Sequence, residues 1–459
     1  MNNSYEGFLQ RKSISDPATG MDVVPTLNPL LRPYQADMVR WALRRGRAGL
    51  FVDCGLGKGP MQMEWADKQP YECLIAAPLA VAHQFVREAD KFGIDLAYAK
   101  DQSEITKRIT VTNFERLDSF NPAQFGAIAI DESSILKNAA GAYCTWMIDA
   151  FKHAPFRLCS SATPAPNDVM ELGTQAEFLG VMTRGEMLAM YFTHDGGDTS
   201  KWRVKGHAQS VFWNWMASWS VVCRRPSDLG YKDDGFILPP LHMHEQCVKV
   251  DAPSHGYLFA VEAQTLQDRQ AARRDSIGDR VNAAAQIVNA SDKPYLVWCN
   301  LNTESSELAK AIPGAVEVTG SDTDAHKESA IADFISGRIR VLVSKPKIFG
   351  LGLNLQNCAD MVYVGISDSY EQFYQSVRRC WRFGQLKEVN VHIIIAETEG
   401  AVLANIKRKE READATYESM VGHMKELNAA ALHGATVRNK TTYKPTKTMT
   451  IPNWMGVDV

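Results

Sequence analysis

The stretch VDCGLGKG, residues 52–59, contains the residue types that bind phosphate groups. An apolar run leads into two glycines, Gly55 and Gly57, and Lys58 follows them. A glycine turn between a strand and a helix directs backbone N–H groups at phosphates, and the lysine adds a positive charge. Gly59 stands where such a loop ordinarily has a serine or threonine that ligates magnesium. A purely structural glycine turn is the alternative interpretation.

A second candidate is the acidic pair Asp131 and Glu132, which ends the apolar run AIAIDE (127–132). Carboxylates at the end of a buried strand are costly unless a cation or a reaction needs them. Asp131 is predicted to hold magnesium, and Glu132 is predicted to orient and deprotonate an attacking water. The alternative is a helix cap that uses Asp131 or Ser133.

The third candidate is QSVRRCWRFGQ, residues 375–385. Arg379 and Arg382 are three residues apart, which places them on one face of a helix. Two guanidinium groups repel each other unless an anion lies between them, and the γ-phosphate in its transition state is such an anion. The alternative is a solvated basic helix face, with Arg378 as the expected surface member.

These candidates lie within short apolar runs that alternate with helix-like stretches. The first series of strand-like runs comprises 74–78, 109–113, 127–132 and 156–164, and the second comprises 295–300, 315–320, 339–345, 361–367 and 391–395. Strands that alternate with helices are typical of parallel sheets covered on both faces. The expected fold class is therefore α/β, with two lobes.

The loop-like segment between the two series of strand-like runs indicates where one domain ends and the next begins. Residues 1–240 are expected to form an N-terminal lobe with a Trp-rich insertion near 190–235, residues 241–432 a C-terminal lobe, and residues 433–459 a weakly ordered tail. The insertion contains a candidate basic patch with stacking potential, formed by Lys201, Trp202, Arg203 and Lys205. It also contains an expected helical core stripe of Trp213, Trp215 and Trp219.

Composition limits the function classes. The net charge of the 459 residues is −3, so any surface that binds nucleic acid must be a local groove. No run of eighteen apolar residues occurs and the first residues have no apolar signal core, which argues against a membrane association. Nine cysteines without a CxxC pair favour reduced thiols in the cytoplasm. A metal site at His242, His244 and Cys247 is disfavoured, because no second pair completes a zinc shell.

Together with four further stretches, the three candidates resemble the motif series of superfamily-two DEAD/DEAH-box helicases. The four are LRPYQ (31–35), CLIAAPLAVAHQF (73–85), SSATP (160–164) and KPKIFGLGLNLQ (345–356). Their order and spacing are similar to those of the Swi/Snf-like branch, for which LRPYQ and QxxxRxxRxGQ are specific. DESS stands where that branch often has DEAH. The resemblance covers roughly residues 30–395, and the compact size is similar to that of a bacteriophage or bacterial member.

The resemblance implies two tandem RecA-like lobes with a nucleotide cleft between them, and ATP and Mg²⁺ as cofactors. The implied adenine pocket consists of Gln35 with Arg32 and Tyr34, and the implied phosphate cradle of Gly55, Gly57, Lys58 and Gly59. Ser161 and Thr163 would couple hydrolysis to lobe movement, and Arg379 and Arg382 would be arginine fingers with Gln385 beside them. Gly352 would approach the nucleotide, and Gln356 the nucleotide or the strand.

The resemblance also implies contacts to the DNA backbone that do not read sequence. The implied positions are Pro78 to His83, Thr112 and Asn113 in the first lobe, and Ser344, Lys345 and Gln356 in the second.

The expected function is an ATP-dependent DNA translocase or helicase in phage or bacterial replication, recombination or repair. Its substrate would be duplex or forked DNA in the cytoplasm, or in the host cytoplasm for a phage protein, and a nuclease or replication partner is left open. Alternatives are a strand-separating helicase, the motor subunit of a restriction or nuclease complex, and a nucleotide- and DNA-binding module whose hydrolysis is impaired because of Gly59.

Overall fold

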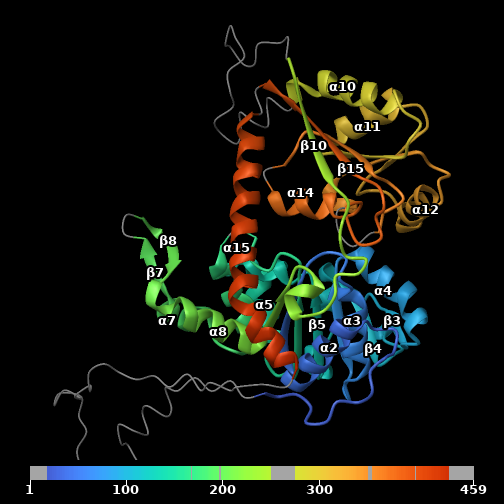
Figure 1. The fold of residues 1–459 in the computed structure, drawn as a ribbon. Helices are drawn as coiled ribbons and strands as arrows, with labels where there is room; N and C mark the ends of the chain where they lie inside the picture. Colours follow the sequence, from blue (N-terminus) through green and yellow to red (C-terminus); the bar gives the residue numbers. More distant parts are fainter. Residues whose placement is uncertain are drawn as a thin grey trace, which may run out of the picture.

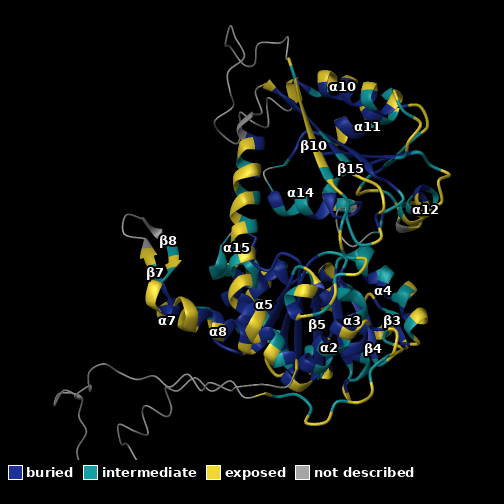
Figure 2. Ribbon diagram, in the orientation of Figure 1, coloured by how far each residue is buried: buried dark blue, intermediate teal, exposed yellow. Residues whose placement is uncertain are grey.

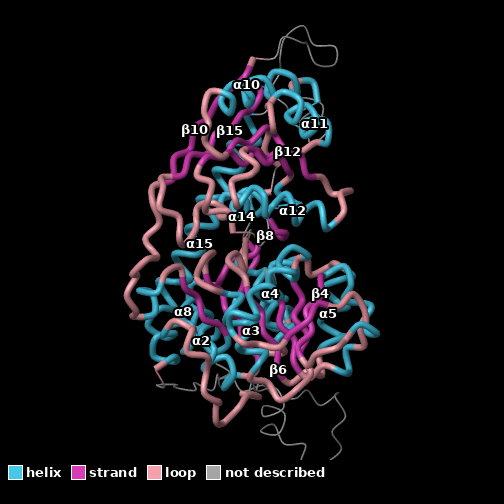
Figure 3. Tube along the Cα trace, turned by 90° about the vertical axis from the view of Figure 1, so that its right-hand side faces the viewer, coloured by secondary structure: helices cyan, strands magenta, loops and turns pink. Residues whose placement is uncertain are grey.

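A computed structural model describes residues 18–166, 168–195, 198–249, 274–349, 354–367, 369–397 and 400–433. The chain forms two α/β lobes, one above the other in Figures 1 and 3, and a long C-terminal helix lies beside both. The predicted α/β class with two parallel sheets is confirmed. The predicted tail lies outside the described residues, except for His433.

The first lobe is built on a seven-stranded sheet in the order β3-β4-β2-β5-β6-β1-β9, in which all pairs are parallel. Its strands are β1 (Arg47–Val52), β2 (Cys73–Ala77), β3 (Leu96–Tyr98), β4 (Ile109–Asn113), β5 (Ala127–Asp131), β6 (Phe156–Ser160) and β9 (Ser220–Cys223). Its helices are α2 (Pro33–Arg45), α3 (Lys58–Asp67), α4 (Leu79–Phe92), α5 (Ala142–Phe151), α6 (Leu172–Leu179), α7 (Arg184–Tyr191) and α8 (Gln209–Trp219). Short 3-10 helices include η4 (Ser133–Lys137) and η7 (Pro226–Leu229).

Apolar side chains cover both faces of this sheet, as expected for parallel strands. Along β1, Leu50 and Val52 join one buried cluster with α2 and α3, whereas Phe51 points to the other cluster with α8. This period of two fixes which face each strand residue meets.

The second lobe is built on a six-stranded parallel sheet in the order β10-β15-β14-β11-β13-β12. Its strands are β10 (Leu241–Val248), β11 (Tyr295–Cys299), β12 (Ala315–Val318), β13 (Val341–Ser344), β14 (Asp360–Val364) and β15 (Val389–Ala396). Its helices are α10 (Ile277–Asn289), α11 (Asn302–Ala311), α12 (Asp324–Ile335), α13 (Pro346–Phe349) and α14 (Tyr370–Val377).

Strand β10 lies at the edge of the second sheet and is largely exposed (Figure 2). His242 and His244 share one face of this strand, and Cys247 lies on the other because side chains alternate. In the described part of the chain, no three His, Cys, Asp or Glu residues are grouped to hold a metal. The placement of these side chains on two faces of β10 does not bring them together.

The Trp-rich insertion contains an antiparallel hairpin, β7 (Phe192–Asp195) and β8 (Asp198–Val204), between α7 and α8. The predicted core role of Trp213, Trp215 and Trp219 is confirmed, because all three are buried in α8. One member of the candidate basic patch, Lys205, is held by hydrogen bonds to the backbone. The Lys205 ammonium donates to Ala189 O at 2.8 Å, which fixes it to the end of α7.

Helix α15 (Gly400–Leu432) belongs to the cores of both lobes. Leu403 and Ile406 pack in the core of the second lobe, whereas Tyr417, Met420 and Met424 pack in that of the first. The hydroxyl of Tyr417 donates to Phe51 O at 3.0 Å and to Cys223 O at 3.2 Å. The range 241–432 predicted for the C-terminal lobe therefore ends in a helix that packs across to the first lobe. None of the helices in the described ranges has the length and apolarity that a membrane crossing requires.

Candidate active site

The phosphate-loop stretch forms a strand, a glycine turn and a helix, as the sequence predicts. Strand β1 ends at Val52 and α3 begins at Lys58. Gly55 and Gly57 have φ angles of 87° and 83°, a region that favours glycine. The Lys58 ammonium donates to Val52 O at 2.9 Å, so its charge is held over the loop.

The acidic pair lies at the carboxyl end of β5, which β6 separates from β1 in the sheet. Asp131 Oδ1 accepts from Gln62 Nε2 of α3 at 2.6 Å, and burial raises the pKa of the Asp131 carboxyl. Ser133 instead donates to Gln175 at 2.7 Å, and η4 has no side-chain cap. The helix-cap interpretation of Asp131 and Ser133 is therefore wrong.

Glu132 is held in an unusual backbone conformation. Its φ of 67° is the only positive value at a non-glycine position among the described residues, and such strain concentrates at functional sites. Its Oε1 accepts from Ser161 Oγ at 2.5 Å and Ser134 Oγ at 3.0 Å, and its Oε2 accepts from Gln375 Nε2 at 2.9 Å. Burial, then the nearby Glu371 carboxylate, raises the pKa of Glu132. Ser161 and Gln375 thus fix the carboxylate from the two lobes, whereas the Ser134 hydroxyl is shared with Glu371, to which it lies closer, at 2.6 Å.

The sequence analysis did not single out Gln375, although it opens the QxxxRxxRxGQ motif. Of the two predicted coupling residues, Ser161 contacts Glu132 directly, and its hydroxyl also accepts from Thr163 N at 3.0 Å. Ser161 therefore links Glu132 to the backbone of Thr163 through two hydrogen bonds.

Arg379 and Arg382 do not lie on a helix face, which corrects the prediction. Helix α14 ends at Val377, and both arginines belong to the turns that follow it. The Arg379 guanidinium donates to Gln375 O at 2.8 Å and to Gln375 Oε1 at 2.9 Å. Burial lowers the pKa of both guanidinium groups, that of Arg382 to about 10 with Arg379 as the second cause. Two neighbouring guanidinium groups that line one cavity are suited to bind an anion.

The expectation that Arg378 is a surface residue is wrong. Only 8% of Arg378 is exposed, and its Nη2 donates to Asp53 Oδ2 of the first lobe at 2.8 Å.

One cavity of about 230 Å³ brings the predicted groups of both lobes together. Its lining includes Gly55, Gly57, Lys58, Gly59, Pro78, Asp131, Glu132, Arg379 and Arg382. The volume and the opposed charges suit a polyphosphate with a divalent cation. Asp131 is a carboxylate of the cavity lining that could hold Mg²⁺, an ion that takes its other ligands from waters and substrate phosphates in many sites. These residues therefore fit a magnesium ion, although Gly59 lacks the side-chain hydroxyl that a serine or threonine would supply at this position.

The predicted adenine residues lie behind the phosphate loop. Gln35 Nε2 donates to Leu56 O at 2.9 Å, and a Cβ at Gly57 would lie 2.2 Å from that nitrogen. The Tyr34 hydroxyl donates to the same carbonyl at 2.9 Å. The Arg32 guanidinium lies 4.8 and 5.0 Å from the ring centroids of Phe236 and Phe383. Adenine recognition by these residues stays a prediction.

The second-lobe predictions are mixed. Gln385 is buried and donates to the carbonyls of Gln356, Cys358 and Cys380 at 3.0–3.2 Å, so it braces the loop and does not line the cavity. Gln356 Nε2 donates to Phe383 O at 3.0 Å. Gly352 lies outside the described residues.

Two predicted DNA contacts are buried side chains. Thr112 and Ser344 are both fully buried, and Ser344 Oγ donates to Val318 O at 2.8 Å. Their hydroxyls do not reach the surface, so contacts of these two positions with DNA could involve only the backbone and stay a prediction. Asn113 is also largely buried and bonds to Tyr98 and Glu115.

His83 and Lys345 are partly exposed and stay candidates. The His83 Nδ1 atom lies 3.9 Å from the Glu328 carboxylate of α12, so His83 lies where the two lobes face each other. Lys345 follows the carboxyl end of β13, at the same edge of the sheet as the cleft.

The fold and the cavity define a class of protein. It has two α/β lobes, each built on a parallel sheet, with phosphate-binding and acidic groups on one lobe and arginines on the other. A model of the helicase conserved C-terminal domain matches residues 279–384. The chain is therefore similar to the Swi/Snf-like branch of the superfamily-two helicases.

Two curated relatives illustrate the relationship. One is the SWI/SNF-related matrix-associated actin-dependent regulator of chromatin subfamily A-like protein 1 of Xenopus laevis, 22% identical over 80% of this chain and 42% of the relative. The other is the DNA annealing helicase and endonuclease ZRANB3 of Mus musculus, 22% identical over 90% of this chain and 43% of the relative. The chain thus spans less than half the length of these relatives.

A solved structure shares the fold. It is a fragment assigned as an HsdR subunit of a type I restriction enzyme from Vibrio vulnificus YJ016, with a TM-score of 0.50 and 16% identity over 87% of this chain and 70% of that one.

Proposed function

We propose that this chain hydrolyses ATP and uses the cycle to move along DNA, as a translocase or helicase. One observation carries the proposal: Lys58 and Glu132 from the first lobe and Arg379 and Arg382 from the second line the same cavity. A site divided in this way is complete only when the lobes are together, so each turnover can drive a lobe movement.

The chain's own residues have separate roles in the proposed reaction. Lys58 and the loop N–H groups bind the phosphates, and Asp131 would hold the magnesium ion, which supplies charge neutralisation when bound. Glu132 orients a water and accepts its proton, because its carboxylate is fixed by hydrogen bonds from Ser161 and Gln375 and its pKa is raised by burial. Arg379 and Arg382 stabilise charge that develops on the transferred phosphoryl group.

DNA as the track is supported by the name of a similar protein, a DNA annealing helicase and endonuclease, and by the similarity of the chain to the Swi/Snf-like branch. We place this activity in phage or bacterial DNA replication, recombination or repair, in the cytoplasm of the cell or host. The motor of a restriction or nuclease complex is the competing proposal, and it requires a partner that cleaves.

The test is the ATPase rate of the full chain without DNA and with single-stranded, double-stranded and forked DNA. Stimulation by duplex without strand separation supports a translocase, whereas displacement of a labelled strand from a fork supports a helicase. A chain that binds ATP and DNA but shows no turnover with any of them would instead be a binding module, and the proposal would fail.

A further inference from the structure

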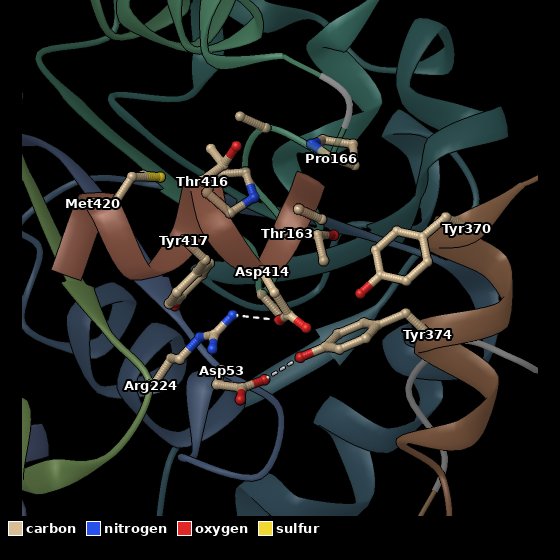
Figure 4. A pocket seen from close by; sticks show the side chains of 14 residues that line it. Asp53, Thr163, Pro166, Arg224, Tyr370, Tyr374, Asp414, Thr416, Tyr417 and Met420 are labelled. Atoms are coloured by element: carbon tan, nitrogen blue, oxygen red, sulfur yellow. Dashed lines mark hydrogen bonds and ion pairs between the residues drawn. The ribbon is translucent and has the colours of Figure 1, made fainter. Parts of the chain in front are cut away.

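The carboxylate of Asp53 joins the phosphate loop to the second lobe. Asp53 is the first residue after β1, and its backbone N–H donates to Cys223 O at 3.0 Å. Its Oδ1 accepts from the Tyr374 hydroxyl at 2.7 Å, and its Oδ2 accepts from Arg378 Nη2 at 2.8 Å. Figure 4 shows the Tyr374 hydroxyl pointing at this carboxylate across a small cavity between α14, α15 and the first lobe.

This contact is shielded from water. The side chains of Arg378 and Asp53 are 10% and 11% exposed, so their attraction is weakly screened. The guanidinium also lies 4.4 Å from the Trp381 ring centroid and 5.1 Å from that of Tyr374, distances at which cations interact with aromatic faces. A buried ion pair stabilises an arrangement only when its geometry and remaining hydrogen bonds are satisfied. Here Cys54 N supplies a further bond to Asp53 Oδ1 at 2.6 Å.

Residues next to Tyr374 and Arg378 in the chain line the candidate active site. Tyr374 and Arg378 are four residues apart and meet Asp53, while Gln375 is turned toward Glu132. Arg379 follows Arg378 directly and is bonded to Gln375. The position of α14 relative to the phosphate loop therefore sets where Arg379 and Arg382 lie.

We propose that Asp53 is the docking acceptor of the phosphate loop, and that Tyr374 and Arg378 are positioning residues that bring Arg379 and Arg382 into the site. This inference rests on the proposed ATP hydrolysis. Loss of the contact leaves Lys58 and the loop intact in the first lobe, so nucleotide still binds. The arginines are then misplaced, so the chemical step slows.

The experiment compares Tyr374→Phe, Arg378→Gln and Asp53→Asn with the parent chain. DNA-stimulated ATPase should lose about tenfold or more in kcat, in line with a charge-assisted hydrogen bond, while the affinity for a fluorescent ATP analogue stays within about twofold. Arg378→Lys, which keeps the charge, should recover part of the rate. Matched controls are Tyr143→Phe, whose hydroxyl bonds within the first lobe, and Arg338→Gln, an exposed arginine; both should match the parent.

A double-mutant cycle separates this role from general stability. Asp53→Asn combined with Arg378→Gln should be no slower than the worse single variant, because both remove one contact. Additive losses, or equal kcat in all variants, overturn the proposal. A loss of analogue affinity that matches the loss of kcat also overturns it, since the loop itself would then be damaged.

Hydrogen exchange tests the docking independently of catalysis. Peptides that cover residues 52–60 and 370–382 should exchange faster in Tyr374→Phe and Arg378→Gln than in the parent chain and the controls. A parent chain that hydrolyses no ATP would refute the proposed function, and this exchange comparison would still decide whether Asp53 docks the second lobe. Unchanged exchange in both peptides overturns the docking.

Discussion

At the scale of single residues, Glu132 is the side chain on which hydrolysis is expected to depend most. Glu132→Gln keeps the shape and the Ser161 and Gln375 neighbours but cannot accept a proton from water. DNA-stimulated turnover should fall by about 10²–10⁴-fold, the usual contribution of a general base, while ATP binding is retained. Steady-state rates and binding of a fluorescent ATP analogue measure the two effects.

The matched control is Glu307→Gln, an exposed carboxylate on α11 that should leave turnover unchanged. Full activity of Glu132→Gln would refute its assignment as the base.

Gly59 allows a direct test of the missing hydroxyl. A Cβ built there would have only ordinary contacts, with Glu88 Oε2 and Phe85 Cε1 at 3.9 Å. Gly59→Thr should lower the magnesium concentration for half-maximal ATPase and tighten magnesium-dependent nucleotide binding by about 1–3 kcal/mol. A magnesium titration of the rate and calorimetry of nucleotide binding are the measurements.

Backbone strain is the complication in this test. Gly59 lies in the first turn of α3 directly before Pro60, and a side chain before proline disfavours helical angles. Gly59→Thr combined with Pro60→Ala removes that effect, and Pro60→Ala alone is the control. Equal magnesium midpoints in all variants would mean that the hydroxyl position has no role here.

The residues of the site that sequence predicts are those whose type and spacing carry the chemistry, such as Lys58, Asp131 and Glu132. Their partners Gln62 and Gln375 are not predicted, because the hydrogen bonds of a glutamine depend on tertiary packing, although the motif spacing of Gln375 is a signal that could have found it. Thr112 and Ser344 were placed on the DNA surface by motif position. They are buried because each lies in a strand with a neighbouring strand on both sides, in a sheet whose faces are covered by helices and loops.

At the scale of elements, α15 is where sequence reasoning was incomplete. Its charged, helical pattern was visible, but the pattern does not say against which lobe the apolar positions pack. Tyr417 supplies the answer, since its ring lies in the first-lobe core and its hydroxyl bonds to carbonyls of β1 and β9. The Arg224 guanidinium lies 4.7 Å from its ring centroid, and Arg224 Nη2 bonds Asp414 of α15 at 2.6 Å.

Tyr417 should therefore contribute strongly to stability. Tyr417→Ala should lower the free energy of unfolding of the first lobe by about 3–5 kcal/mol, as for other buried aromatic residues. Tyr417→Phe, which removes only the hydroxyl, should cost about 1 kcal/mol. Urea unfolding followed by tryptophan fluorescence measures both. Lys425→Ala on the exposed face of α15 is the control, and an equal midpoint for Tyr417→Ala and Lys425→Ala would show that α15 does not brace the first lobe.

At the scale of the whole molecule, the α/β class and the two sheets followed from alternating strand and helix patterns. The way the lobes meet did not, because it depends on contacts such as that of Arg378 with Asp53, which are 325 positions apart in sequence. From the sequence alone, Arg378 is expected to be a surface charge. Its partner Asp53 becomes its neighbour only in the folded chain.

The net charge of the whole molecule bears on how its affinity for DNA is expected to depend on salt. The net charge of −3 means that binding must come from a local surface, and the proposed contacts are to phosphates. Affinity should then fall with salt and depend little on sequence. For roughly 6–10 phosphate contacts the loss between about 50 and 200 mM salt is about 10³–10⁵-fold. Fluorescence anisotropy with unrelated duplex, single-stranded and forked sequences measures this, and an affinity indifferent to salt or confined to one sequence contradicts a tracking motor.

Two lysines of the second lobe can test where the proposed DNA surface lies. Lys345 follows β13 at the carboxyl edge of the sheet that faces the cleft, whereas Lys293 precedes β11 at the opposite edge and lies 3.7 Å from Asp360. Lys345→Ala should lower the slope of log K against log salt by about 1, since one phosphate contact is lost. Lys293→Ala should leave the slope unchanged, because it removes the same charge from a surface that the proposed path does not cross. Equal slopes for Lys345→Ala and the parent chain, with full affinity, would move the DNA path away from this edge. An equal loss in both variants would mean that only the net charge matters.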